Sequence, residues 1–285
     1  MKKHKLGIIG LGKRGYKLLN EVMLDMERID VTAICDICPQ SLERASLLIE
    51  ERRGKKPLLF DDYKKLIASP EVEAVIIASA WDSHAEMAIF ALEAKKPIGL
   101  EVGGAESIDA CWSVVDAYER TKTPFMFLEN CCFGRRELMA IHMQSQGLFG
   151  EIVHCAGGYM HDLRNQIIGN GDDCDYRFQS YKEHNCDNYP THDLGPIAKL
   201  LDICTGNRIL TLTSTASKAR GINEYIKSKL PHDKDLAETE FSQGDIVTTV
   251  MKCARGETIV LTLDTTLPRG YYSRNFTDEI CNFPC

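Results

Sequence analysis

The N-terminal stretch GIIGLGKRG constrains the fold of this chain more than any other feature. An apolar run at residues 6–9 leads directly into Gly10, Gly12 and Gly15, and an amphipathic helical pattern follows. A strand, a Gly-x-Gly-x-x-Gly turn and a helix are typical of dinucleotide-binding folds, because the glycines let the backbone turn tightly and approach a pyrophosphate at the helix N-terminus. A glycine-rich turn without a ligand is the alternative reading.

The same alternation of short apolar runs and helical patterns continues through the first 125 residues. Further strand candidates lie at residues 31–35, 58–60, 74–78, 98–100 and 125–128. Strands that alternate with helices predict a parallel, doubly wound sheet. We therefore expect an α/β Rossmann domain over residues 1–125.

A different pattern follows residue 150. Residues 208–216, 245–253 and 257–264 alternate apolar and polar side chains, as half-buried antiparallel strands do. Residues 162–190 are polar and rich in Asn and Asp, which predicts a long functional loop. We expect an α+β domain over 126–285 with a largely antiparallel, open-faced sheet. The last stretch, TDEICNFPC, adds no strand or helix pattern, so this domain is expected to be incomplete at its C-terminus. An unusually short second domain is the alternative.

Composition and charge exclude several classes of partner. A formal net charge of −7 offers no basic surface, so nucleic acid and anionic membranes are not expected partners. No apolar run approaches the roughly 18 residues of a bilayer span, and the N-terminus lacks a signal-peptide pattern, which predicts a cytoplasmic protein. A homo-oligomer that pairs through the open sheet face is compatible with this architecture.

The twelve cysteines are expected to be reduced thiols in that compartment. Cys35 and Cys38 form a CxxC, which indicates either redox or zinc chemistry or chance spacing. Because no second CxxC accompanies them to complete a zinc site, we expect no metal site.

The acidic residue at the end of the second strand indicates the type of nucleotide. Asp36 follows the glycine turn at the spacing where a carboxylate binds the ribose 2′-hydroxyl. Ile37 and Cys38 offer no positive charge for a 2′-phosphate, so the expected cofactor is NAD rather than NADP. Asp36 as a simple strand-end cap is the alternative. Leu11, inside the glycine turn, belongs to the same candidate site.

A second candidate cofactor segment is ASAWDSHAEMA, after the fourth strand. Ligands bind beyond the carboxyl ends of strands in such sheets, so the stretch from Ser79 to His84, which includes Asp82 and Ser83, is expected to be a cofactor-binding loop. Trp81 would form a wall of the site. His84 would begin the next helix, and a purely structural role for it is the alternative.

The stretch NYPTHDLGP carries the candidate catalytic residues Tyr189 and His192. Pro190 suits the first position of a helix, which places Tyr189 directly before the helix start. Histidine titrates near neutral pH and therefore suits proton transfer. Asp193 either orients His192 or favours the helix N-terminus electrostatically.

A Rossmann domain followed by an open-faced antiparallel sheet resembles the superfamily of glucose–fructose oxidoreductase and inositol dehydrogenase. In its dehydrogenases, the strand after the fourth ends in Glu-Lys-Pro, and the lysine takes part in proton transfer. Here the stretch reads GLEVGGAES, so Glu101 is followed by Val102. An apolar valine cannot move a proton, which counts against ordinary alcohol oxidation.

One branch of that superfamily, glycoside hydrolase family 109, resembles this chain from about residue 5 to residue 276. The matching stretches are GLEVGGAES, ENCCFGRRELM, GLFGEIVHCAGGYMHDLR, YPTHDLGPIAKLLDI, GNR, ASKARG, GDIVTTV and GETIVLTLDTTLPR. The resemblance implies an NAD-dependent α-N-acetylgalactosaminidase-like enzyme. It oxidises sugar C3 transiently, eliminates the C1 aglycone after loss of the C2 proton, adds water and reduces C3 again, so it needs no pair of carboxylates.

The resemblance also assigns individual residues. Tyr189 and His192 would face the sugar near the nicotinamide. The remaining matched positions are Trp81 to His84, Glu101, Val102 and Asn130 for the cofactor, and Tyr159, Arg177 and either Tyr271 or Tyr272 for the sugar. Phe133 departs from the pattern, because a tyrosine is expected there. Two other functions therefore stay open: a net sugar or inositol dehydrogenase, and a catalytically impaired NAD-binding relic.

Overall fold

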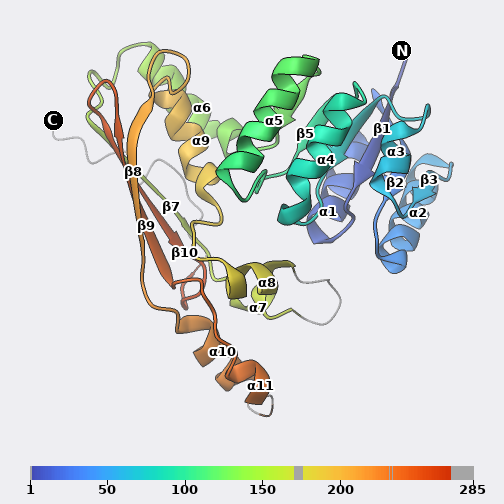
Figure 1. Ribbon diagram of the computed structural model, residues 1–285. Coiled ribbons are helices and arrows are strands. Elements are labelled where there is room, and N and C mark those ends of the chain that lie inside the picture. The colour runs from blue at the N-terminus through green and yellow to red at the C-terminus, as the bar shows by residue number, and fades with distance from the viewer. Residues whose placement is uncertain (1, 170–175, 231, 233, 271–285) are drawn as a thin grey trace. The chain divides into compact units, whose positions relative to one another are not determined.

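The chain folds into two compact units in the computed structural model, which describes residues 2–169, 176–230, 232 and 234–270 (Figure 1). The first unit is Met1–Leu128 and the second is Glu129–Cys285. Of the described helices, none combines the length and the apolar character that a membrane span needs.

The first unit alternates strands and helices in chain order. Its strands are β1 His4–Ile9, β2 Ile29–Cys35, β3 Leu58–Phe60, β4 Ala74–Ile77, β5 Ile98–Leu100 and β6 Phe125–Phe127. Its helices are α1 Lys13–Glu21, the 3₁₀ turn η1 Met23–Asp25, α2 Pro39–Arg53, α3 Tyr63–Ala68, α4 Trp81–Glu93 and α5 Ile108–Thr121.

All strand pairs of this sheet are parallel, in the order β3-β2-β1-β4-β5-β6. Consecutive side chains of β1 enter opposite cores: Ile8 packs with residues of α1 and α2, whereas Ile9 packs with residues of α3, α4 and α5. The predicted doubly wound parallel sheet is therefore confirmed. The order reverses between β1 and β4, and the carboxyl ends of parallel strands share one edge, where such sheets bind ligands.

The second unit places helices beside a mixed sheet. Its strands are β7 His154–Met160, β8 Ile209–Ala216, β9 Ile246–Cys253 and β10 Thr258–Asp264. Its helices are η2 Asn130–Phe133, α6 Arg135–Ser145, α7 Arg164–Ile167, α8 Tyr176–Glu183, α9 Pro190–Leu200, α10 Gly221–Lys229 and α11 Lys234–Ala237.

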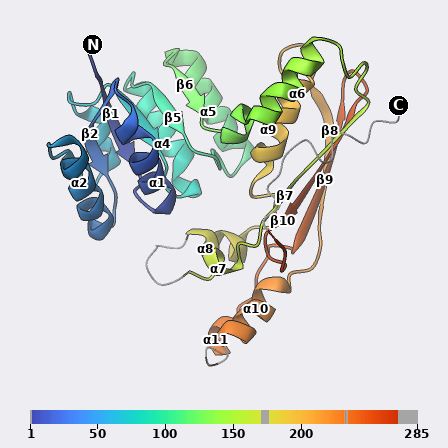
Figure 2. The ribbon, with the colours of Figure 1, turned by 180° about the vertical axis from the view of Figure 1, so that it is seen from behind.

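The order of this sheet is β7-β10-β9-β8, with β7 and β10 parallel and the other pairs antiparallel. Helices α6 and α9 lie beside one face, as seen from behind in Figure 2. Buried residues of α6 and α9 form one core with Met251, Ile259 and Leu261 of the sheet. The expected α+β domain with a largely antiparallel sheet is confirmed.

Three details differ from the sequence-based expectations. The first unit extends to Leu128, beyond the expected boundary at 125, because β6 continues the parallel sheet beside β5. The stretch 162–190 is not simply a loop: α7 and α8 form there, and Tyr181 of α8 is fully buried. Strand β7 was not expected, because its HCAGGYM stretch contains two glycines and lacks regular alternation.

The buried core of the second unit allows a matched stability test. Leu261 of β10 is 0% exposed, whereas Leu212 of the edge strand β8 is 57% exposed. We expect Leu261→Ala to lower the free energy of unfolding by about 2–5 kcal/mol, because it leaves a cavity. Leu212→Ala should change it by less than about 0.5 kcal/mol. Urea unfolding of both variants measures the difference, and equal losses would contradict the assigned core.

Candidate functional site

The glycine turn after β1 has no room for side chains at two positions. Gly10 has a φ of +87°, and a Cβ there would lie 2.5 Å from the backbone of Ala78 and Ser79. A Cβ on Gly15 would lie 1.9 Å from the carbonyl oxygen of Gly10. A Cβ on Gly12, in contrast, would meet no described atom within 4 Å. The turn is thus packed tightly against the sheet and open at Gly12, as close approach of a ligand requires.

Asp36 connects the turns that follow β1 and β2. Its Oδ2 accepts a hydrogen bond from the Leu11 N–H at 2.5 Å, and its Oδ1 accepts one from the Cys38 N–H at 2.8 Å. The carboxylate therefore lies beside the glycine turn, where its ribose-binding role was predicted. These hydrogen bonds also make Asp36 a cap at the end of the strand, which was the alternative role.

The segment after β4 is held by its own hydrogen bonds. Helix α4 begins at Trp81, so the loop expected to reach His84 is shorter than predicted. The Ser79 hydroxyl lies 2.9 Å from that of Ser83, and the His84 Nε2 lies 3.0 Å from the Ser79 carbonyl oxygen. Burial lowers the pKa of His84 to about 4, which keeps the ring neutral near pH 7.

Trp81 packs against the loop after β5. A Cβ on Gly103 would lie 2.1 Å from its indole ring, and Trp81 is 7% exposed. Trp81 therefore joins the segments after β4 and β5. Its contact with a cofactor, like those of Asp82, Ser83 and His84, stays a prediction.

The buried Glu101 at the end of β5 forms an ion pair within the same unit. Its Oε1 accepts a hydrogen bond from the Arg14 Nε at 2.9 Å and lies 2.8 Å from Arg14 Nη2. Arg14 lies inside the glycine motif and was not predicted as a site residue. Its pairing joins α1 to the Glu101–Val102 segment, which was predicted to contact the cofactor.

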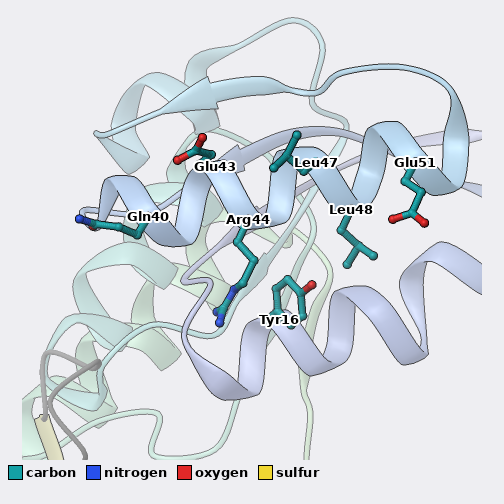
Figure 3. A pocket seen from close by; sticks show the side chains of 7 residues that line it. All are labelled: Tyr16, Gln40, Glu43, Arg44, Leu47, Leu48 and Glu51. Atoms are coloured by element: carbon teal, nitrogen blue, oxygen red, sulfur yellow. The ribbon is translucent and has the colours of Figure 1, made fainter.

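A pocket between α1 and α2 is lined by Tyr16 of α1 and by side chains of α2, among them Arg44 (Figure 3). Arg44 lies over the ring of Tyr16 at 4.2 Å and donates a hydrogen bond to the Leu11 carbonyl oxygen at 3.1 Å. Arg44 thus supports the same turn that Asp36 holds from its N–H side.

The second unit gathers four of the predicted site residues. The rings of Tyr159 and Tyr189 stack with centroids 4.4 Å apart, and the His192 ring lies 5.1 Å from Tyr159. Arg177 Nε donates a hydrogen bond to the Tyr189 hydroxyl at 3.1 Å. Burial alone would lower the pKa of Arg177, but the neighbouring tyrosines raise it, so the guanidinium stays charged. Tyr189 directly precedes α9, as its neighbour Pro190 predicted.

His192 is paired with a buried carboxylate that was not predicted as a site residue. Its Nδ1 lies 2.7 Å from Oε1 of Glu129, a side chain that is only 5% exposed. Burial would raise the pKa of Glu129, but the hydrogen bond and charge of His192, with help from the Cys131 N–H and Thr191, lower it overall. Glu129 therefore stays ionised and fixes the orientation of the His192 ring.

Asp187 is a second carboxyl group beside this cluster. It accepts a hydrogen bond from the Tyr189 N–H at 3.0 Å. Burial of the carboxyl raises its pKa to about 6, although that N–H and the charge of His192 oppose the shift. It is therefore able to exchange a proton near neutral pH.

Cys131 and Phe133 flank the pair in η2. Cys131 Sγ lies 3.7 Å from His192 Nδ1, and burial raises the pKa of the thiol to about 12, so it is protonated at neutral pH. Phe133 is 53% exposed, and Lys199 Nζ lies 4.3 Å from the centroid of its ring. The exposed Asn130 directs its amide toward Cys131 Sγ at 3.7 Å.

Each unit therefore collects its own share of the predicted residues. Those predicted to bind the cofactor, apart from Asn130 and Tyr189, follow the ends of β1, β2, β4 and β5 in the first unit. Those predicted to bind the sugar cluster in the second unit, except Tyr271 and Tyr272, which lie outside the described residues. Glu129, Arg14 and Asp187 were missed. The available sequence signal for Glu129 was an acidic residue that directly follows an apolar strand pattern, as in FMFLE.

Comparison with known families matches nearly the whole chain. A family model described as "Glycosyl hydrolase 109, C-terminal domain" matches residues 133–279. A model described as "Oxidoreductase family, NAD-binding Rossmann fold" matches residues 4–128. The point at which the two matches meet lies close to the division between the two structural units.

Curated relatives are similar over most of the chain. An α-N-acetylgalactosaminidase of Tannerella forsythia is 36% identical over 290 residues, which cover 94% of this chain and 62% of the relative. A glycosyl hydrolase family 109 protein of Shewanella baltica is 36% identical over 280 residues, which cover 95% of this chain and 60% of the relative. The chain thus spans about 60% of the length of these relatives.

Solved structures share the fold at low sequence identity. Scyllo-inositol dehydrogenase of Lactobacillus casei with bound NAD(H) and scyllo-inositol superposes with a TM-score of 0.74 at 17% identity, covering 95% of this chain and 72% of that one. Myo-inositol 2-dehydrogenase of Lactobacillus plantarum superposes with a TM-score of 0.71 at 17% identity, and the match covers 94% of this chain and 72% of that one. At this identity the likeness shows the fold alone.

The Glu129–His192 pair predicts an acid-dependent stability. Because the pKa of Glu129 is lowered in the folded state, its stabilisation is present above the usual glutamate pKa of about 4.3 and is lost as the pH falls through the lowered pKa. We expect Glu129→Gln to lower the free energy of unfolding by about 1–3 kcal/mol near neutral pH. Urea unfolding over a pH series should show that this difference shrinks on acidification.

The exposed Glu151 of the same unit provides the control. Glu151→Gln should follow the wild type over the whole series. A loss in Glu129→Gln that stayed constant down to acidic pH would contradict a stabilising charged pair.

Proposed function

The chain belongs to glycosyl hydrolase family 109, and on this basis we propose that it is an NAD-dependent glycosidase that hydrolyses terminal N-acetylgalactosamine-type glycosides. One observation carries the proposal: His192, oriented by the buried Glu129, lies with Tyr189 and Tyr159 in a single cluster. The cluster offers a proton-transfer group beside aromatic and cationic side chains, which suits a sugar whose hydroxyls exchange protons.

The residues of the first unit fit the cofactor NAD. Gly10 and Gly15 exclude side chains, Gly12 is open, and Gly12 is also the N-cap of α1 and offers no side-chain cap, which suits a pyrophosphate. Asp36 would bind the ribose, and the segments at Ser79–His84 and Glu101–Val102 would hold the remainder. When bound, NAD supplies reversible oxidation at sugar C3, which makes the C2 proton acidic and the C1 aglycone a leaving group.

The second unit supplies the proton transfers. His192 would take the proton of the C3 hydroxyl, because Glu129 accepts from its Nδ1–H and stabilises the positive ring that results. Tyr189 would act at the C2 proton, since its hydroxyl accepts a hydrogen bond from the Arg177 Nε and its ring stacks beside that of His192. Tyr159 and Arg177 would also position the sugar.

Val102 favours a glycosidase over a net dehydrogenase. The segment after β5 carries a valine, which can neither accept nor donate a proton, where the dehydrogenases it resembles carry a lysine. Phe133 favours a different alternative, an NAD-binding protein with impaired catalysis, because it lacks the hydroxyl group expected at this position.

The labelling of the product distinguishes these functions. In D₂O, elimination and readdition of water should place deuterium at C2 of the released sugar, and NADH should not accumulate. His192→Ala should lower aglycone release by about 10²–10⁴-fold, since it removes a general acid–base group. NMR of the sugar and absorbance of the aglycone measure both effects.

The exposed His184, at the end of α8, gives a matched control variant. His184→Ala should release aglycone at the wild-type rate. Product without deuterium at C2 would exclude the elimination route, and accumulation of NADH with substrate would instead indicate a dehydrogenase. An NAD-binding wild type that releases no aglycone would support the impaired protein.

The proposed cofactor role of Asp36 is tested by calorimetry. Asp36→Ala should weaken NAD binding by about 1–3 kcal/mol, because it leaves ribose hydroxyls and two backbone N–H groups unpaired. Asp30→Ala, at the opposite end of the same strand β2, should bind NAD as the wild type does. Unchanged NAD affinity in Asp36→Ala would reduce Asp36 to a structural cap.

A further inference from the structure

We propose that Glu129, Cys131 and His192 form a binding site for a thiophilic divalent cation of the Zn²⁺ class. The cluster joins a carboxylate, a thiol and an imidazole, and one donor atom from each lies within 4.8 Å of the other two. These are the ligand types that tetrahedral zinc sites combine, three from the protein with a fourth position for water. The proposal goes beyond the glycosidase activity and does not require it.

The separation of sulfur and nitrogen already fits a tetrahedral site. Zinc–ligand bonds of about 2.3 Å to sulfur and about 2.0–2.1 Å to nitrogen place these two atoms about 3.5 Å apart. Cys131 Sγ and His192 Nδ1 are 3.7 Å apart. A cation would therefore need almost no movement of these two side chains.

The carboxylate needs a small displacement. Glu129 Oε1 lies 2.7 Å from His192 Nδ1, which is a hydrogen-bond distance, whereas tetrahedral ligands would stand about 3.4 Å apart. Its other oxygen, Oε2, is buried and, among the described residues, forms no hydrogen bond within 3.5 Å, although the Thr191 side chain near this carboxyl helps to lower its pKa. Rotation of the carboxylate would give a cation either oxygen. A buried acceptor left without a donor is the second observation that points to a ligand here.

The charge of the cluster also favours a cation. The buried Glu129 carboxylate lies within 4.8 Å of both the thiol sulfur and the imidazole nitrogen, so its negative charge would draw a cation to them. Binding would release the thiol proton to solvent and move the Nδ1 proton of His192 to Nε2, so that one metal–sulfur and one metal–nitrogen bond form. His192, whose side chain is 13% exposed, would give the cation access from solvent.

The site would also regulate the proposed reaction. A cation on Nδ1 leaves only Nε2 of His192 to carry a proton, so the ring can no longer accept one from a sugar hydroxyl. It also separates His192 from the carboxylate that orients it. This consequence rests on the proposed function, whereas metal binding itself does not.

Cd²⁺ titration of the full chain tests the site independently of activity. We expect one tight Cd²⁺ per chain with an ultraviolet thiolate-to-metal absorption band that Cys131→Ser loses. The Cd²⁺ affinity should fall by more than about 100-fold in Cys131→Ser, since loss of an outer partner alone costs about 10–100-fold. Glu129→Gln, which keeps the side-chain shape, should also weaken binding. Cys111→Ser, an exposed cysteine of α5, should bind Cd²⁺ as the wild type does.

Unchanged Cd²⁺ affinity and absorption in both Cys131→Ser and Glu129→Gln would overturn the site. Inhibition provides a separate measurement: Cd²⁺ should inhibit aglycone release by the wild type more strongly than by Cys131→Ser, each compared with its own metal-free rate. If the wild type binds Cd²⁺ through Cys131 but never releases aglycone, the metal site stands and the proposed function fails.

Discussion

A buried carboxylate needs partners to remain charged, and Glu129 obtains them only if two distant parts of the second unit meet. Its oxygen Oε1 accepts from the Cys131 N–H at 2.9 Å and faces His192 Nδ1 at 2.7 Å. The first contact shapes the turn η2, and the second joins that turn to the start of α9. Leaving such a buried charge unpaired would cost about 3–5 kcal/mol. The pair therefore determines where His192 and Tyr189 lie, and the aromatic cluster depends on it.

In the first unit it is the glycine turn that determines where the candidate site residues lie. It does so because its tight packing leaves no room for side chains. Only a glycine fits at Gly10 and Gly15, because a Cβ would overlap the backbone of the segment directly after β4 or of the turn itself. This close packing lets the Leu11 N–H reach Asp36 and its carbonyl oxygen reach Arg44. Here the sequence pattern and the geometry agree, since spacing of glycines within one short segment determines the contacts.

The contrast between contacts within one short segment and contacts between distant segments explains which features the sequence could predict. Local patterns predicted the parallel sheet, the strands β8 to β10 and the start of α9 at Pro190, since each depends on neighbours a few residues apart. They did not predict β7, whose glycines weaken its strand pattern and which is stabilised by pairing with β10. Nor did they predict the pair of Glu129 and His192, because the two lie 63 positions apart in the chain. The family resemblance located Tyr159, Arg177, Tyr189 and His192, but not the groups that hold them.

The two carboxyl groups near His192 are driven in opposite directions. Burial raises the pKa of Asp187 to about 6, whereas the pKa of Glu129, also opposed by burial, is lowered by His192 and the backbone. Neighbouring acids with separated pKa values commonly divide the roles of fixed charge and proton carrier. Glu129 fits the fixed charge, which orients His192 and balances its positive form. Asp187, which accepts a hydrogen bond from the Tyr189 N–H, suits the role of proton carrier, because both its protonated and its ionised form are accessible near neutral pH. The second unit thus holds an imidazole, a carboxyl group that can change its charge near neutral pH and a carboxylate held ionised, which are the groups that the proposed proton transfers would use.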